Sequence, residues 1–183
     1  MLNPLPVVLV TSINGDKTNV FTVAWAGIVC SHPPMLSISI RPERLSYHCI
    51  KKSMEFVINI PSGNMAKIVD FCGVKSGRDI NKIDHFNLTL NESTTVSTKN
   101  IDECLISLEC KVNNILALGS HDMFIADITG VNVDKSIIDE KGKIHFEKAR
   151  LLSYSHGEYY TLPTKTEGKF GYSVMKHNKI KKR

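Results

Sequence analysis

Two short polar segments of the chain carry residue types that suit the binding of an anion. In the first, Ser46 follows Arg44 in the opening turn of a predicted helix, and Lys51 and Lys52 follow it. A hydroxyl group and free backbone N–H groups at a helix N-terminus suit a phosphate. The alternative is a simple helix cap with exposed lysines. The sequence alone leaves both interpretations open.

The second polar segment is Ser76-Gly77-Arg78-Asp79, with Lys82 three residues further on. We expect Asp79 to cap a short helix, which leaves Arg78 free to reach a phosphate or a carboxylate. A solvated loop without a ligand is the alternative interpretation.

His121 belongs to a polar triplet, Ser120-His121-Asp122, that interrupts an apolar β segment. Buried polar groups cost free energy unless they are satisfied, so the triplet indicates a pocket wall, a strand edge or a bulge. No cysteine or second histidine stands at metal-ligand spacing from it, so we expect no metal site. The chain also lacks the Gly-x-Ser-x-Gly elbow of a hydrolase.

The segment from Asn19 to Pro34 offers a surface on which a planar ligand could lie. It is rich in β-tolerant residues, carries no charge as far as Ser31, and ends at two prolines. The small residues Ala24, Ala26 and Gly27 leave room against the backbone, and Trp25 supplies an aromatic face. A strand buried on both faces inside a barrel is the alternative.

Composition favours one globular domain. The chain has 183 residues, of which 42% are hydrophobic and 22% are charged. Five lysines and arginines among the last eight residues account for the net charge of +5, so a basic surface for nucleic acid is not indicated. No apolar run is long enough for a membrane span, and the start of the chain does not resemble a signal peptide. Five cysteines without a Cys-x-x-Cys pair favour a reducing cytoplasm.

The positions of apolar and turn residues predict a mainly β protein with short helices. No βαβ repetition and no Gly-x-Gly-x-x-Gly motif occurs, so we expect a closed antiparallel barrel with helical insertions. The expected strands are 6–12, 19–30, 35–40, 55–60, 106–115, 118–130 and 131–137. We expect the first two to form a hairpin with Asn14-Gly15 at the centre of its turn. The expected helices are 41–52, 65–71 with Asn64 as its cap, and 79–84.

Two segments near the C-terminus place aromatic residues between glycines. They are Gly157-Glu158-Tyr159-Tyr160 and Gly168-Lys169-Phe170-Gly171-Tyr172-Ser173. Such a segment wraps a partner subunit or closes a flat ligand against a barrel, and the alternative is a tail that docks on its own domain.

Several of these motifs, in this order, resemble the flavin reductase-like proteins, and among them the flavoredoxin group of the FMN-binding split-barrel superfamily. They are Asn19 with Thr22-Val23-Ala24-Trp25, Ser31-His32-Pro33-Pro34, 41–46, Phe56-Val57-Ile58-Asn59, Ser76-Gly77-Arg78-Asp79 with Lys82, Gly119-Ser120-His121-Asp122, and 168–173. The family often has Gly-Asp-His where this chain has Gly-Ser-His-Asp.

The resemblance implies a closed split barrel over residues 1–175 that binds FMN, followed by a basic tail over 176–183. Transferred to this sequence, it implies that one set of residues lines the ring and ribityl chain: Asn19, Ala24, Trp25, Cys30 and Ser31. A second set would face the phosphate: Ser46 and Lys52, helped by Arg78 or Lys82. His121 would lie at the reactive face of the flavin.

The resemblance further implies a cytoplasmic homodimer that moves reducing equivalents, with no membrane or nucleic-acid partner. The first expectation is a flavin reductase that takes hydride from NAD(P)H. One alternative is a flavoredoxin-type carrier that passes electrons between FMN and a protein partner. Another is a flavin-binding module without catalytic activity.

Overall fold

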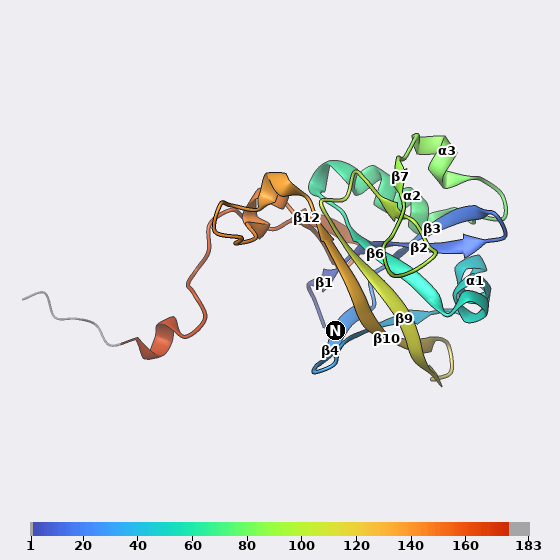
Figure 1. The fold of residues 1–183 in the computed structure, drawn as a ribbon, viewed down its shortest axis with the longest axis horizontal. Coiled ribbons are helices and arrows are strands. Elements are labelled where there is room, and N and C mark those ends of the chain that lie inside the picture. Colours follow the sequence, from blue (N-terminus) through green and yellow to red (C-terminus); the bar gives the residue numbers. More distant parts are fainter. Residues whose placement is uncertain (1, 176–183) are drawn as a thin grey trace, which may run out of the picture.

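The computed structural model describes residues 2–175, and a seven-stranded antiparallel sheet forms its centre (Figure 1). The order of the strands is β3-β2-β6-β9-β10-β5-β4. Their bounds are β2 (Val8–Asn14), β3 (Lys17–Val23), β4 (Ala26–Ser31), β5 (Pro34–Ile40), β6 (Glu55–Ile60), β9 (Ile106–Ala117) and β10 (Asp122–Val133). Two small sheets accompany it: β1 (Leu5–Pro6) with β11 (Leu152–Ser155) and β12 (Glu158–Thr161), and β7 (Leu90–Asn91) with β8 (Asn100–Ile101). The expected mainly β architecture is confirmed.

The closed barrel that we expected is not observed, because the hydrogen-bonded order of the described strands ends at β3 and β4. The single strand expected over 19–30 is also divided at Ala24 and Trp25. The chain changes partner there, since β3 pairs with β2 whereas β4 pairs with β5. One backbone hydrogen bond, from the Ser39 N–H to the Trp25 carbonyl (2.9 Å), attaches the junction to β5.

The hairpins follow the turn residues of the sequence. β2 and β3 are joined by a two-residue turn at Gly15 and Asp16, where Gly15 has a φ of +61°, so the hairpin is confirmed but its turn lies one residue after the expected Asn14-Gly15 centre. β9 and β10 form one long hairpin, so the expected strands 118–130 and 131–137 are wrong in their bounds. Residues 118–121 are the turn of this hairpin, and 135–137 form the 3-10 helix η2 (Lys135–Ile137).

Three short α-helices lie against the sheet: α1 (Leu45–Ser53), α2 (Ala66–Val74) and α3 (Lys82–Phe86). The expected helix caps are wrong. Asn64 lies inside the 3-10 helix η1 (Gly63–Met65), and α2 has no side-chain cap. Asn81, not Asp79, caps α3, because its Oδ1 accepts the N–H groups of Ile83 (3.1 Å) and Asp84 (3.4 Å).

Two hydrophobic clusters fix these elements. Strands of the large sheet and α1 form the first, which includes Phe21, Ile38, Ile50, Phe56 and Phe124. The second lies under α2 and α3 and includes Leu9, Val20, Met65, Val69 and Ile83. Because β3 contributes to both clusters, its polar residues Asn19 and Thr22 are held in fixed positions between the helices.

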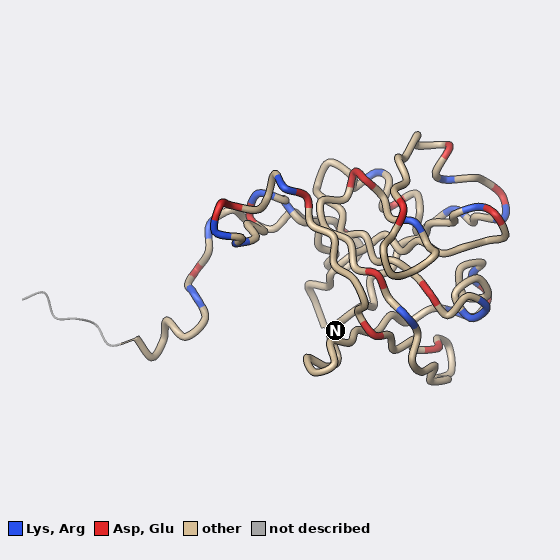
Figure 2. The backbone as a smooth tube through the Cα atoms, viewed as in Figure 1, with Lys and Arg blue, Asp and Glu red and all other residues tan. Residues whose placement is uncertain are grey.

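The C-terminal part of the described chain contains η3 (Phe146–Ala149) and η4 (Tyr172–Val174), and after β12 it runs away from the sheet (Figure 1). Lysines, arginines and carboxylates are interspersed over residues 134–150 (Figure 2).

The expected basic tail lies outside the described residues. Between residues 2 and 175 no helix has the length and hydropathy needed to cross a membrane.

Candidate functional site

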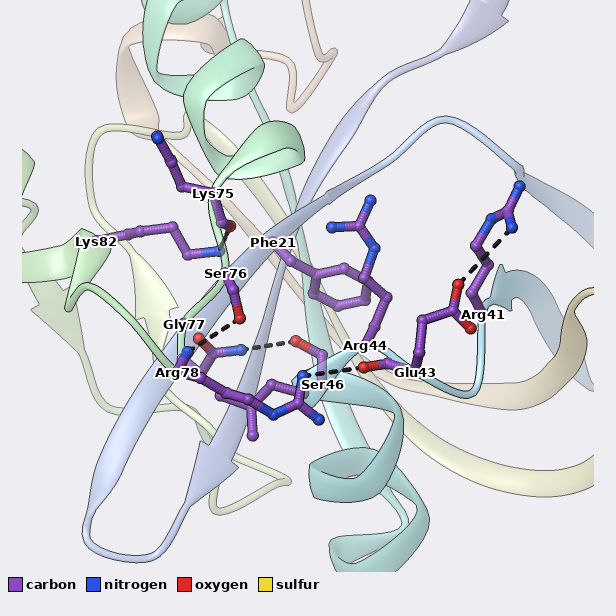
Figure 3. A pocket seen from close by; sticks show the side chains of 12 residues that line it. Phe21, Arg41, Glu43, Arg44, Ser46, Lys75, Ser76, Gly77, Arg78 and Lys82 are labelled. Atoms are coloured by element: carbon purple, nitrogen blue, oxygen red, sulfur yellow. Dashed lines mark hydrogen bonds and ion pairs between the residues drawn. The ribbon is translucent and has the colours of Figure 1, made fainter.

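A pocket of about 500 Å³ opens between β3, the start of α1 and the loop that follows α2 (Figure 3). We call it the anion pocket because cations dominate its lining. The charged lining residues are Arg41, Arg44, Lys75, Arg78 and Lys82, against one carboxylate, Glu43. These cations repel one another in the empty pocket, and a bound anion would attract all of them. The arrangement therefore favours the binding of an anion.

A buried hydrogen bond joins the strand to the helix at the base of the anion pocket. The Asn19 Nδ2 group donates to the Ser46 Oγ (2.6 Å), and both side chains are almost fully buried. A Cβ atom on residue 77 would collide with the Asn19 amide oxygen, so the loop can approach this close only with glycine there. Asn19 therefore positions both Ser46 and the Gly77 loop.

Arg78 lies across the opening of the anion pocket beside Ser46 (Figure 3). Its guanidinium Nη1 donates to the backbone carbonyl of Glu43 (2.9 Å), which ties the loop to the start of α1. The guanidinium carries five N–H donors, so this contact leaves others for a ligand.

Lys82 is a cation that is only 3% exposed. Its ammonium group donates to the carbonyls of Cys72 (3.3 Å) and Lys75 (3.2 Å) at the C-terminal end of α2. Burial lowers the pKa of Lys82, and the charge of Arg44 adds to this effect. Both partners are neutral, so an anion in the pocket would supply the missing counter-charge.

Arg44 projects beside the Phe21 ring into the open part of the pocket (Figure 3). Arg41 forms an exposed ion pair with Glu43 (3.7 Å). In the described part of the chain, no hydrogen bond or ion pair engages the Arg44 guanidinium, so it remains available to a ligand.

A second pocket of about 180 Å³ continues from the first, and we call it the Trp25 pocket. The two share Phe21, Arg41 and Arg44, and the second one also includes Ala24, Trp25 and His121. Together they form a cationic region that leads to an aromatic region. This arrangement suits a ligand with a phosphate at one end and a flat ring system at the other.

His121 packs on Trp25, with ring centroids 4.5 Å apart at an angle of 38°. Its Nδ1 lies 2.9 Å from the Ser120 Oγ. Burial lowers the pKa of His121, and the charge of Arg41 acts in the same direction. The neutral imidazole is therefore favoured near pH 7. The polar triplet does not interrupt a strand: Ser120 and His121 form the hairpin turn, and Asp122 accepts the Tyr47 hydroxyl (2.7 Å).

The structure brings together most of the residues expected at the site. Asn19, Ser46, Arg78 and Lys82 line the anion pocket, and Ala24, Trp25 and His121 line the Trp25 pocket. Three other residues that we expected at the site lie outside both pockets. Lys52 is exposed in the last turn of α1, at the opposite end from Ser46, and Cys30 and Ser31 lie at the far end of β4.

Arg41 and Lys75 were not expected at the site from the sequence, and Arg44 was noted there only as a neighbour of Ser46. The available signals were the Arg-x-x-Arg spacing directly before α1 and the lysine directly before the Ser76 loop. Only the fold shows that these two segments face each other across β3.

The chain is similar in sequence and in fold to several known proteins. Residues 1–163 match the model of the flavin reductase like domain. An uncharacterized protein of Pyrococcus abyssi is 31% identical over 165 residues, which cover 90% of this chain and 94% of the relative. The flavoredoxin of Desulfovibrio vulgaris (Miyazaki F) has a TM-score of 0.88 and 28% identity, with 94% of each chain covered. The flavoredoxin of Methanosarcina acetivorans has a TM-score of 0.85 and 26% identity, with coverage of 96% of this chain and 95% of that one.

Proposed function

Because this chain belongs to the family of the flavin reductase like domain, we propose that it binds FMN and transfers reducing equivalents. One observation carries the proposal: the anion pocket and the Trp25 pocket adjoin each other and share the lining residues Phe21, Arg41 and Arg44. FMN has the matching form, a dianionic phosphate joined by a short polar chain to a planar ring. The likeness to two flavoredoxins, each more than 25% identical, supports the same ligand.

In this proposal, residues of the anion pocket hold the phosphate. Arg44 and Arg78 donate charge-assisted hydrogen bonds, and the buried ammonium of Lys82 supplies a counter-charge. Asn19 holds the Ser46 hydroxyl in place through their buried contact. Lys52, expected at the phosphate, has no part in this contact, since it lies outside the anion pocket, and Cys30 and Ser31, expected along the ring and ribityl chain, lie outside both pockets.

The ring system would lie against the backbone at Ala24, with Trp25 and His121 at its edge. When bound, FMN supplies the capacity to accept and donate hydride or single electrons. The protein orients the ring and limits its access to water. The neutral His121 imidazole can donate or accept a hydrogen bond at the open side of the pocket, where an electron donor must approach.

We propose NAD(P)H-dependent flavin reduction as the first candidate activity. The second candidate is electron exchange with a protein partner, and the flavoredoxin neighbours favour it. We further propose a homodimer, because the Trp25 side chain is 56% exposed and β4 presents Ile28 (70% exposed) and Val29 (49%) to solvent. Adjoining exposed apolar side chains of this kind mark a protein interface.

Anaerobic titration of the purified protein tests both activities. The protein is first saturated with FMN, and its affinity for FMN is compared with that for riboflavin, which has no phosphate. NADH or NADPH is then added while flavin absorbance is recorded. Rapid bleaching supports the reductase, whereas bleaching only with a reduced redox protein supports the carrier. Equal affinity for FMN and riboflavin would contradict the phosphate assignment, and absence of flavin binding would refute the proposal.

A further inference from the structure

The chain after β12 exposes several apolar side chains, and we call residues 162–175 the C-terminal arm. Its exposed apolar residues are Leu162 (49%), Phe170 (109%), Tyr172 (59%), Val174 (83%) and Met175 (66%). Isolated exposed apolar residues are common on proteins, but a fully exposed phenylalanine within such a series needs a partner surface.

The arm has local structure that presents Phe170 outwards. Gly171 has a φ of +84°, and the Tyr172 N–H donates to the Lys169 carbonyl (2.9 Å), which closes a turn around Phe170. The Tyr172 ring lies so close to Gly168 that a Cβ atom there would collide with it. A preformed turn of this kind reduces the conformational entropy lost when its aromatic side chain enters a pocket.

A groove of about 770 Å³ on the body of the molecule matches this side chain in chemistry. It is lined by Leu2, Leu5, Trp25, Ala26, Met123 and Tyr154, among others, and none of its described lining residues is Asp, Glu, Lys or Arg. The groove and the Trp25 pocket share Trp25 and Ser39. Trp25 is exposed to solvent in the single chain, and a side chain that occupied the groove would pack against it.

The C-terminal arm starts away from the groove of its own molecule and leads further from it. His156 and Gly157, in the turn between β11 and β12, line the groove, but the arm begins at the opposite end of β12, after Thr161. From there it runs away from the sheet (Figure 1). At about 3.3–3.6 Å per residue, the arm is long enough to reach across a neighbouring molecule.

We propose that the C-terminal arm of each chain docks into the groove of a second copy, with Phe170 packed beside Trp25. This proposal rests on the homodimer of the proposed function and goes beyond it, because it identifies which segment completes the wall of the Trp25 pocket. The contact is reciprocal, so a two-fold dimer contains two such contacts. An aromatic anchor enclosed in an apolar pocket is typical of the residues that dominate interface energetics.

The single tryptophan of the chain makes the contact measurable without flavin. The experiment compares acrylamide quenching of Trp25 fluorescence in the wild type, in Phe170→Ser and in the control Leu162→Ser, which also removes an exposed apolar side chain from the arm. We expect the quenching constant to rise about twofold in Phe170→Ser, because the ring that shields Trp25 is gone, and to change little in Leu162→Ser. Light scattering measures the oligomeric state of the same samples.

A mixing experiment distinguishes a partner's arm from the molecule's own arm. Trp25→Phe protein, which keeps its arm but emits no tryptophan fluorescence, is mixed with Phe170→Ser protein. Restored shielding of Trp25 supports docking between copies. If the Phe170→Ser protein is a dimer and its Trp25 has the wild-type quenching constant, the arm contact is overturned although the homodimer is supported. A wild-type protein that is monomeric by light scattering overturns both the dimer and the exchange.

Discussion

At the scale of single residues, the proposed phosphate site contains cations that have no anionic partner among the described residues. Lys82 is buried against two carbonyl groups, and Arg44 projects into open space. Such an arrangement is unfavourable in the empty protein and becomes favourable when a phosphate enters, so the cost of bringing the cations together is offset only in the complex.

Arg78 and Lys52 form a matched pair for testing this point, because both are exposed cations and only Arg78 lines the anion pocket. A charge-assisted hydrogen bond contributes about 1.5–3 kcal/mol, which corresponds to one to two decades of affinity. We expect Arg78→Ala to weaken FMN binding by that amount and riboflavin binding little, as measured by quenching of flavin fluorescence. Lys52→Ala serves as the control. A similar loss in both variants would contradict the assignment.

His121 allows a test of the ring end of the site. We expect His121→Ala to retain FMN and to slow its reduction by about 10–1000-fold, since the variant loses a positioning group and not a nucleophile. Stopped-flow absorbance with NADH, NADPH or a reduced protein donor measures the rate. Ser120→Ala removes only the hydrogen bond to the Nδ1 atom and should have a smaller effect. Wild-type rates with all donors would show that His121 is structural.

At the scale of elements, the division of one expected strand into β3 and β4 creates the flat surface of the Trp25 pocket. Ala24 lies at this junction and is half-buried in the pocket lining. Ala24→Leu should therefore prevent flavin binding while leaving the fold intact, because the added atoms occupy the place of the ring. The flavin content and circular dichroism of the purified variant check this. Ala117→Leu, at an exposed position in β9, is the control, and a folded Ala24→Leu protein with full flavin content would refute the placement.

Glu109 in β9 anchors the loop between β7 and β8, and its side chain is fully buried. Burial alone would raise its pKa, but hydrogen bonds from the Thr95 hydroxyl and the Thr94 N–H, with others, lower the pKa to about 2. The Asn132 amide also donates to it (2.8 Å). The carboxylate therefore stabilises the fold without a cation, through directed N–H and O–H groups.

The stabilisation by Glu109 depends on pH in a defined way. Because the pKa of Glu109 is lowered in the folded protein, its carboxylate contributes fully to the free energy of unfolding above the ordinary pKa of 4.5. This contribution is lost as the pH falls from 4.5 towards about 2. Glu109→Gln should lower the free energy of unfolding at pH 7 by about 1.5–3 kcal/mol and flatten the acid dependence in this range. Urea unfolding at several pH values measures both effects. Glu103→Gln is the control, since exposed Glu103 accepts one N–H group, from Thr89.

The accuracy of the sequence prediction differs between elements for physical reasons. β6 was predicted with its observed bounds, and the hairpin of β2 and β3 was predicted to within one residue of its turn at Gly15 and Asp16, because local pattern and turn chemistry determine both. The break at Trp25 was missed, since only tertiary contacts decide where a strand changes partner. The same reason applies to the site: Ser46 and Arg78 stand in recognisable local motifs, whereas Arg44 gains its role from a loop that is distant in sequence.

At the scale of the whole molecule, charge is distributed so that one pocket attracts anions while the rest of the surface is mixed. Figure 2 shows carboxylates and cations interspersed along the described chain, whereas the anion pocket gathers five cations against Glu43. Because the Debye length falls from about 30 Å at 0.01 M salt to about 3 Å at 1 M, FMN affinity should decrease over this range. Riboflavin affinity should stay nearly constant, and isothermal titration measures both. Parallel decreases for the two ligands would show that the phosphate is not recognised electrostatically.

β4 lies at the edge of the large sheet, where it pairs with β5 alone among the described strands, and it exposes the apolar side chains of Ile28 and Val29. An apolar strand with unpaired backbone groups is a template for intermolecular β pairing, which leads to aggregation. If a second copy covers this edge, the separated chain is the aggregation-prone species. Solutions diluted below the dimer dissociation constant, or heated until the dimer separates, should then become turbid before the fold itself is lost. Charged residues at positions 28 and 29 would suppress this turbidity.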